Sequence, residues 1–160
     1  MLKNKFILFS IISTIIVVLD QITKILVLDK MPLYHSIAII DGFFNLTHIH
    51  NTGGAFGLLA DQHPILRAVI FLGISILSLF IILYYYAKTP PQFPMLRMGL
   101  SLIFGGAVGN IADRIRMGEV VDFLDFYIGN YHWPAFNVAD SAVSVGVVIL
   151  IYYMLIKKVI

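Results

Sequence analysis

Long apolar stretches separated by short polar segments dominate the hydrophobic pattern of the chain. Four stretches, residues 6–28, 65–86, 95–112 and 139–156, are long enough to cross about 30 Å of hydrocarbon at about 1.5 Å per residue. A proline-rich segment at residues 90–94 separates the second stretch from the third, and proline interrupts helices. The pattern therefore predicts one membrane domain, residues 1–160, that is mainly α-helical and has four transmembrane helices.

Two longer connections, residues 29–64 and 113–138, join these stretches. The first contains the segment 43–50 followed by Gly53 and Gly54, a pattern typical of a strand that ends in a glycine turn. The second contains aromatic residues of the kind enriched at membrane–water interfaces, Phe126, Tyr127, Tyr131 and Trp133. We therefore expect a small β-sheet at the membrane surface.

The composition agrees with a membrane protein. Hydrophobic residues make up 59% of the 160 residues and charged residues only 12%, whereas soluble domains are nearer 45–50% and about 25%. A net charge of +2 without a basic run gives no support for nucleic-acid binding. The absence of cysteine excludes disulfides, thiolate metal sites and cysteine nucleophiles.

The distribution of charge predicts the orientation. An even number of spans places both termini on one side, and that side carries only basic residues: Lys3, Lys5, Lys88, Arg97, Lys157 and Lys158. Cytoplasmic segments are enriched in lysine and arginine, so we expect cytoplasmic termini and both longer connections on the outer side.

Two aspartates beside apolar segments are the strongest candidates for chemistry. Asp122 lies within Val-Val-Asp-Phe-Leu, and Asp140 opens the last apolar stretch. A carboxylate at membrane depth costs a few kcal/mol and usually indicates function. The alternative is structural, since Asp140 with Asn137 can cap the fourth helix. The functional interpretation is an aspartate dyad, in which one carboxyl holds a proton and the other acts as base.

A third aspartate, Asp20, lies inside the first stretch. Asp20 and Lys24 are four residues apart, with the acid N-terminal to the base, which is the favourable order for an ion pair on a helix. We interpret them as a structural pair rather than a catalytic one, because such a pair neutralises itself and a lysine within the bilayer needs an acidic partner.

The third stretch ends in small and polar residues. Gly105 and Gly109 form a small-xxx-small face that favours close helix packing. Asn110 and Asp113 share one helical stripe with Gly106. The structural interpretation is that the glycines serve packing and the helix simply ends in polar residues. It accounts less well for Asn110, because an amide near a membrane needs hydrogen-bond partners.

Two other groups of side chains leave alternatives open. Arg114 and Arg116 either reach toward lipid headgroups or contact a carboxylate, a phosphate or a backbone carbonyl. His48 and His50 would face the same way on a strand, so they could bind a metal. No third ligand is evident in the sequence, and interfacial histidines are common.

Five sequence blocks resemble those of bacterial lipoprotein signal peptidase, also called signal peptidase II. They occur in the order of that family and within its four-span frame, and they extend over nearly the whole chain. The blocks are residues 20–24 (Asp-Gln-Ile-Thr-Lys), 51–57 (Asn-Thr-Gly-Gly-Ala-Phe-Gly), 109–114 (Gly-Asn-Ile-Ala-Asp-Arg), 120–123 (Val-Val-Asp-Phe) and 136–141 (Phe-Asn-Val-Ala-Asp-Ser).

The resemblance implies an aspartic endopeptidase of the inner or cytoplasmic membrane. Its substrates would be prolipoproteins whose cysteine carries a diacylglyceryl group, cut just before that cysteine. The family's catalytic pair matches Asp122 and Asp140. Supporting and substrate-binding positions match Asp20, Lys24, Asn51, Gly53, Asn110, Arg114, Asn137 and Ala139.

The resemblance also implies an architecture. The small outer sheet would correspond to the family's β-cradle, and the second connection to a loop or helix over the active site. It implies no metal or organic cofactor. The expected partners are lipidated prolipoproteins and membrane lipids, without nucleic acid, and we expect a monomer with its active site near the outer face.

Two rival functions use the same residues differently. A small proton-coupled transporter could use the carboxylates as a relay, but it predicts inverted repeats with paired broken helices. The sequence shows no internal symmetry and only four spans. A non-catalytic membrane scaffold leaves Asn110, Asp122 and Asp140 unexplained.

Overall fold

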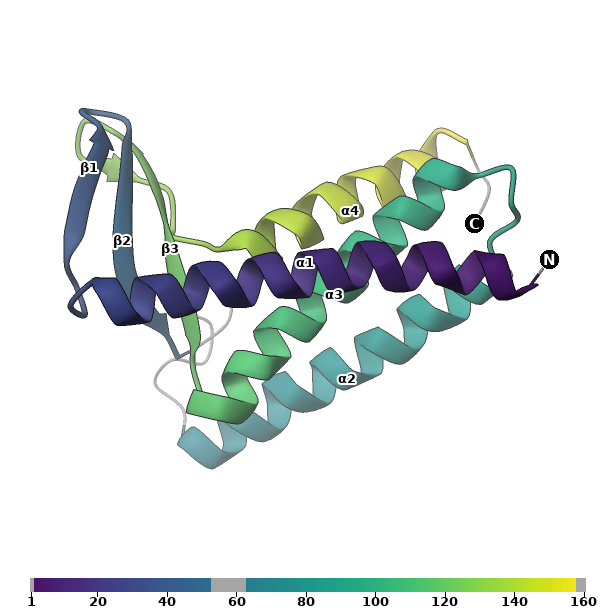
Figure 1. The fold of residues 1–160 in the computed structure, drawn as a ribbon, viewed down its shortest axis with the longest axis horizontal. Helices are drawn as coiled ribbons and strands as arrows, with labels where there is room; N and C mark the ends of the chain where they lie inside the picture. Colours follow the sequence, from purple (N-terminus) through teal and green to yellow (C-terminus); the bar gives the residue numbers. More distant parts are fainter. Residues whose placement is uncertain (1, 53–62, 158–160) are drawn as a thin grey trace.

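Four helices and a small antiparallel sheet make up the structure, a computed structural model that describes residues 2–52 and 63–157 (Figure 1). Gly53 and Gly54, and with them the predicted glycine turn, lie outside the described residues. The helices are α1 (Leu2–Lys30), α2 (Pro64–Lys88), α3 (Pro94–Met117) and α4 (Val138–Leu155). Each is long and apolar enough to cross a membrane, which confirms the predicted number of spans.

The helix α3 extends past its predicted end at residue 112 to Met117. The polar residues of this last part do not break the helix, because several of them are satisfied by neighbouring elements. Gly118 ends it in the left-handed conformation, with φ of +77° and its N–H donating to the Arg114 carbonyl. A glycine adopts this conformation without steric cost.

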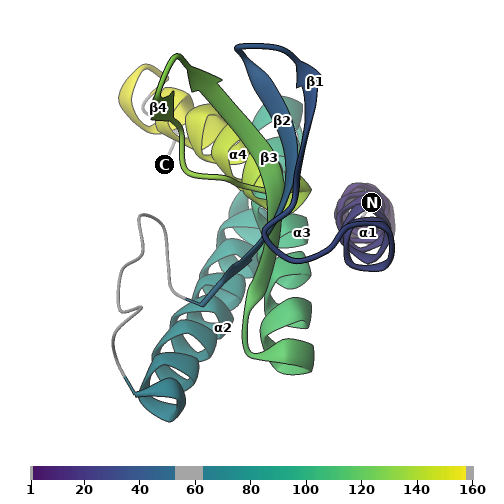
Figure 2. The same cartoon turned by 90° about the vertical axis from the view of Figure 1, so that its left-hand side faces the viewer.

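The strands lie at one end of the helices, whereas the beginning of α1 and the end of α4 lie at the other (Figure 1). The sheet has the order β1 (Ser36–Ile40), β2 (Phe44–Asn51), β3 (Val120–Ile128) and β4 (Tyr131–His132), with antiparallel neighbours. Strand β2 confirms the strand predicted over residues 43–50. Figure 2 views the molecule from this end, with β2 and β3 side by side.

The second connection is not helical; it contains strands, so of the loop or helix that the family resemblance implies it is the non-helical form. Between Gly118 and Asn137 the structure has β3, a turn and β4 rather than a helix. The physical reason is local, because β-branched and aromatic residues dominate Val120–Ile128 and such residues favour a pleated strand. As a result, this connection brings Asp122 alongside β2, where it pairs with Ile49.

The sheet is fixed to the bundle by a small apolar core. Val121 and Phe123 of β3 pack against Val27 and Met31 near the end of α1. All four side chains are buried. Since Asp122 lies between the two apolar β3 residues, this packing also determines where its carboxyl group points.

The predicted small-xxx-small face of α3 is confirmed as a contact with α1. A Cβ added to Gly105 would lie 2.9 Å from the Ser13 carbonyl oxygen, and one added to Gly109 would lie 2.6 Å from Asp20 Oδ2. Gly106 faces α4 instead, because its added Cβ would collide with the Ala139 carbonyl oxygen. These glycines allow α1 and α4 to approach α3 closely enough for their polar side chains to meet.

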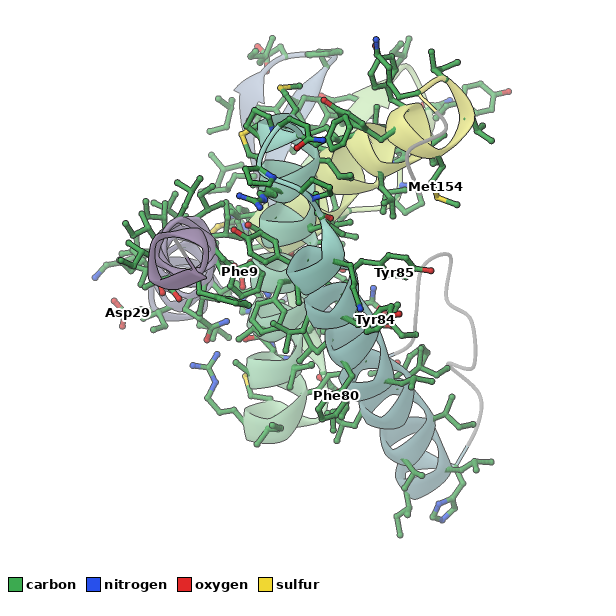
Figure 3. All side chains as sticks on the ribbon, turned by 90° about the vertical axis from the view of Figure 1, so that its right-hand side faces the viewer. Phe9, Asp29, Phe80, Tyr84, Tyr85 and Met154 are labelled. Carbon is green, nitrogen blue, oxygen red and sulfur yellow. The ribbon has the colours of Figure 1, made fainter. Side chains whose placement is uncertain are left out.

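The outer surface of the bundle is apolar, as a lipid-facing surface must be. In Figure 3, Phe80 and Tyr84 of α2 and Met154 of α4 lie on the outside of the bundle, and each is more than 40% exposed. Phe9 of α1 is buried, and its ring packs against that of Tyr86 at a tilt of 54°, with centroids 4.5 Å apart.

Candidate active site

A fully buried ammonium group lies at the centre of the polar interior. Lys24 Nζ is 2.9 Å from Asp20 Oδ2, 2.9 Å from Asp113 Oδ2 and 2.9 Å from Asn110 Oδ1. An ammonium has three N–H donors, so all three are satisfied. The side chains of Lys24, Asp20 and Asp113 are 0% exposed. The predicted Asp20–Lys24 pair is thus present, but it belongs to a cluster that includes a second carboxylate from α3.

This cluster also holds backbone from two further elements. Asp20 Oδ1 accepts the N–H of Ala139 at 2.9 Å, in the first turn of α4. Asp113 Oδ2 accepts the N–H of Val121 at 3.3 Å, in β3. The ion cluster (Asp20, Lys24 and Asp113) therefore fixes the positions of the residues on either side of it, including those next to Asp122 and Asp140.

The two candidate catalytic carboxylates lie where β3 and α4 begin. Asp122 is the third residue of β3 and is 2% exposed. Asp140 is in the first turn of α4, where it forms a capping box with Asn137: the Asn137 side chain accepts the Asp140 N–H, and Asp140 Oδ2 accepts the Asn137 N–H. The predicted helix cap therefore exists, and capping leaves Asp140 Oδ1 available for another partner.

Amide groups connect the two carboxylates. Asn137 Nδ2 donates to Asp122 Oδ1 at 2.7 Å, and Asn51 Nδ2 donates to Asp122 Oδ2 at 3.0 Å. Asn110 Nδ2 donates to Asp140 Oδ1 at 2.8 Å. Because Asn110 Oδ1 accepts from Lys24, the Asn110 amide also joins the ion cluster to the aspartate pair. Neutral amides hold the pair itself, in contrast to the ammonium that holds Asp20 and Asp113.

The Asn137 amide is fully used within the protein. Its Nδ2 lies within hydrogen-bond distance of Asp122 Oδ1, the Val121 carbonyl oxygen at 3.2 Å and Asn110 Oδ1 at 3.3 Å. An amide nitrogen has only two hydrogens. With more acceptors than hydrogens around it and no exposed surface, Asn137 is suited to orienting Asp122 rather than to contacting a substrate.

The environment of Asp122 favours its protonated form. Burial raises the pKa of Asp122 to about 7, and the negative charge of Asp140 raises it further, while the hydrogen bonds from Asn51 and Asn137 oppose both effects. A carboxyl with this pKa can hold a proton at neutral pH and donate it during a reaction.

Arg114 lies on the α2 side of the aspartate pair. Its guanidinium is 5.3 Å from the centroid of the Phe71 ring of α2, a cation–π contact, and it interacts electrostatically with Asp122 and Asp140. Of the open interpretations, the structure supports contact with a backbone carbonyl, because Arg114 Nη1 donates to the Asn110 carbonyl oxygen at 3.5 Å. The neighbouring Arg116 is more exposed and reaches Asp113 at 3.4 Å.

The two histidines of β2 face the same way, as expected, and contact each other. His48 Nε2 and His50 Nε2 are 3.1 Å apart. Among the residues that the structure describes, no three histidine or acidic side chains form a group that could hold a metal ion.

The structure brings together nearly all of the predicted site residues. Asp20, Lys24, Asn110, Asn137 and Ala139 surround the pair and Asn51 contacts it directly, while Gly53 lies outside the described residues. Sequence reasoning did not include Asp113 among the site residues. A signal was present, because Asp113 shares a helical stripe with Asn110 and because the three donors of Lys24 need three acceptors.

Comparison with known proteins agrees with this architecture. A bacterial membrane enzyme solved by the in meso method at 2.3 Å resolution superposes with a TM-score of 0.84 at 34% identity, covering 94% of this chain and 89% of that one. A second in meso structure of a bacterial membrane enzyme, at 1.9 Å, gives a TM-score of 0.82. The fold is therefore that of a membrane enzyme.

Sequence comparison identifies the family. The model of signal peptidase (SPase) II matches residues 12–156. The chain is 55% identical to a lipoprotein signal peptidase of Desulforapulum autotrophicum, with 92% of this chain and 91% of the relative covered. It is 45% identical to one of Syntrophus aciditrophicus, with 98% of each covered. The chain belongs to the signal peptidase II family and is a multi-pass membrane peptidase.

Proposed function

We propose that this enzyme removes signal peptides from prolipoproteins by hydrolysing the bond before a diacylglyceryl-modified cysteine, with Asp122 and Asp140 as the catalytic pair. The observation that carries the proposal is the pair of carboxyls joined by Asn137, one on β3 and one on α4. When two carboxyl groups are close enough for their charges to repel each other, they do not both ionise readily. One can then act as the acid and the other as the base.

The proposed roles follow from the two environments. Asp140 is the base that takes a proton from the attacking water, and Asp122 is the acid that donates a hydrogen bond to the scissile carbonyl. The tetrahedral intermediate then collapses as a proton passes to the leaving amine. We assign to Arg114 the binding of substrate carbonyls or the stabilisation of the developing oxyanion, while Asn51 and Asn137 keep Asp122 oriented.

The position of the site suits a lipid-anchored substrate. Strand β3 and the first turn of α4, which carry Asp122 and Asp140, lie at the sheet end of the bundle, away from the start of α1 and the end of α4 (Figure 1). If the basic segments are cytoplasmic, this end is at the outer face of the cell membrane, where the acylated cysteine of a substrate would lie. Every residue assigned to the mechanism comes from one chain, so a monomer would suffice.

The activity is tested directly with purified protein in lipid. We expect cleavage of a prolipoprotein whose cysteine carries a diacylglyceryl group and no cleavage of the same protein without the lipid. Mass spectrometry of the products locates the cut. Equal cleavage of both substrates, or a cut elsewhere than before the cysteine, would contradict the proposed specificity.

The orientation is tested by cysteine labelling, since the natural chain has no cysteine. A cysteine at position 92, in the exposed turn between α2 and α3, should react with an impermeant maleimide only after the cells are opened. Its matched control is a cysteine in place of Tyr131, which is 87% exposed in the sheet and should react in intact cells. The reverse pattern would overturn the proposed orientation.

A further inference from the structure

A chain of hydrogen bonds lies beside the site and takes no part in the reaction proposed above. His48 Nδ1 is 2.8 Å from the Met31 carbonyl oxygen, His48 Nε2 is 3.1 Å from His50 Nε2, and His50 Nδ1 is 2.9 Å from Glu119 Oε2. We call His48, His50 and Glu119 the histidine clamp. It connects the end of α1, strand β2 and the residue that precedes β3.

The chemistry of the partners fixes the direction of each hydrogen bond. The Met31 carbonyl can only accept, so His48 Nδ1 carries a hydrogen and, in a neutral ring, His48 Nε2 is an acceptor. His50 Nε2 must then donate to His48. In a neutral His50 ring this leaves Nδ1 as an acceptor, and that nitrogen faces a carboxyl oxygen of Glu119.

The complete chain from Met31 to Glu119 therefore requires one more proton than two neutral rings and a carboxylate possess. The extra proton makes one of the two rings an imidazolium or makes Glu119 a carboxylic acid. Without it, one contact of the chain is lost, because either two nitrogen lone pairs face each other between the rings or a lone pair of His50 faces the carboxylate. If a second proton is added to His48, two N–H groups face each other instead.

The clamp stabilises the pairing of β2 with β3 next to Asn51. His50 pairs with Val121 and Asn51 pairs with Val120, so the side-chain contact from His50 to Glu119 crosses the last rungs of β2 and β3. Asn51, the next residue after His50, donates to Asp122 Oδ2. A shift of this strand end would move the Asn51 amide away from Asp122.

Other charged groups in this region have their own partners. Asp29 and Lys30, at the end of α1, form an exposed ion pair at 2.7 Å. Arg116 of α3 reaches Asp113, and Asp122 of β3 is held by Asn51 and Asn137. His35, before β1, is exposed. Glu119 is thus the carboxyl group hydrogen-bonded to the histidines.

We propose that His50 is a positioning residue: through its hydrogen bonds to His48 and Glu119, it holds the end of β2 so that Asn51 stays aligned with Asp122. This inference rests on the proposed role of Asp122. It predicts that removing a hydrogen-bonding group of the clamp lowers kcat, whereas a side chain that restores the hydrogen bond keeps kcat near that of the parent.

Four variants separate this role from simple packing. His50→Phe keeps an aromatic ring without nitrogen atoms, and Glu119→Leu removes the acceptor. Glu119→Gln can donate an amide hydrogen to a neutral His50, so it completes the hydrogen-bond chain without the extra proton. His35→Phe, at an exposed histidine of the same sheet end, is the matched control.

The kinetic expectation is a change in kcat rather than in KM for a lipidated prolipoprotein. His50→Phe and Glu119→Leu should lower kcat about tenfold, the effect of one misaligned hydrogen bond. Glu119→Gln should stay within about twofold of the parent at neutral pH, and His35→Phe should match it. Equal kcat for His50→Phe and His35→Phe would overturn the proposal, as would a kcat of Glu119→Gln as low as that of Glu119→Leu.

A spectroscopic measurement tests the clamp without relying on peptidase activity. Imidazole ¹⁵N spectra of histidine-labelled protein in lipid bilayers, assigned with the histidine variants, report which ring nitrogens carry hydrogen. We expect a hydrogen on His48 Nδ1, and on His50 Nδ1 a proton shared with Glu119 that is absent in Glu119→Gln. Identical His50 spectra in the parent, Glu119→Gln and Glu119→Leu would overturn the clamp. If the parent does not cleave prolipoproteins, the proposed function fails, yet these spectra still decide the state of the clamp.

Discussion

Two pairs of aspartates in this protein are held in opposite ways, and all of them except the half-buried Asp140 are buried. Asp20 and Asp113 contact the ammonium of Lys24, which donates one hydrogen to each. Asp122 and Asp140 are held by the amides of asparagines and by backbone N–H groups. The first pair has a counter-charge within hydrogen-bond distance, whereas the second has none among the side chains that the structure describes.

Under the proposed function, this difference in environment separates the structural carboxylates from the catalytic ones. A buried carboxylate that contacts a cation stays ionised, and its hydrogen bonds are committed to holding other elements in place. Carboxyls held by neutral amides can exchange a proton between them, as catalysis by an aspartate pair requires. The ion cluster places the backbone of Val121 and Ala139, and each of these residues neighbours one member of the pair.

The largest expected effect is loss of cleavage when either member of the pair becomes an amide. Asp122→Asn and Asp140→Asn should each lower kcat roughly a thousandfold or more, and the double variant should be little worse because the two residues act as a unit. Cleavage of a lipidated prolipoprotein measures this, with the exposed Asp41→Asn as control. Substantial turnover by either single variant would remove that residue from the proposed catalytic pair.

The next effect tests the structural side of the comparison. Lys24→Met leaves Asp20 and Asp113 buried without their cation, and this should reduce the free energy of unfolding by about 3–5 kcal/mol. Lys30→Met is the matched control, because Lys30 pairs with Asp29 at 2.7 Å on the exposed end of the same helix. Thermal unfolding in detergent micelles compares them. If both variants unfold at the same temperature, the ion cluster does not have the structural role given to it here.

A smaller effect concerns the dependence of stability on pH. The pKa of Asp122 is about 7 in the folded protein, whereas its ordinary value is 3.8. At a pH between these two values, the folded state therefore holds a proton on Asp122 that the unfolded state has lost. This contribution to stability is fully present below about pH 3.8 and is lost as pH rises toward about 7. The unfolding temperature of the parent should therefore fall more steeply across this window than that of Asp122→Asn. Parallel curves would show that Asp122 titrates alike in both states.

The smallest expected effect comes from the close contact between α3 and α1. Gly109→Ala would place a Cβ 2.6 Å from Asp20 Oδ2, and the ion cluster cannot move away without losing hydrogen bonds. We expect a loss of about 1–3 kcal/mol in unfolding free energy. In Gly73→Ala the added Cβ meets nothing within 4 Å, so this control should not destabilise the protein. An unchanged unfolding temperature for Gly109→Ala would show that the cluster tolerates displacement.

The sequence by itself determined the membrane class, the four helices, the strand near residues 43–50 and the identity of the two reactive carboxyl candidates. It could do so because a long apolar stretch has few stable structures in a bilayer. A charged residue within such a stretch is also rare, because it costs free energy, and it therefore indicates a function. The spacing of four residues was also enough to predict the pair of Asp20 and Lys24, because that contact lies within one helix.

Only the tertiary structure decided which polar groups meet across elements. Asp113 joins Lys24 from another helix, Asn137 connects β3 to α4, and His50 reaches Glu119 across two strands. These contacts join residues far apart in the sequence, and they depend on the close approach that Gly105, Gly106 and Gly109 allow. Residue type and local spacing do not specify such distances, because they follow from how the helices and the sheet pack together.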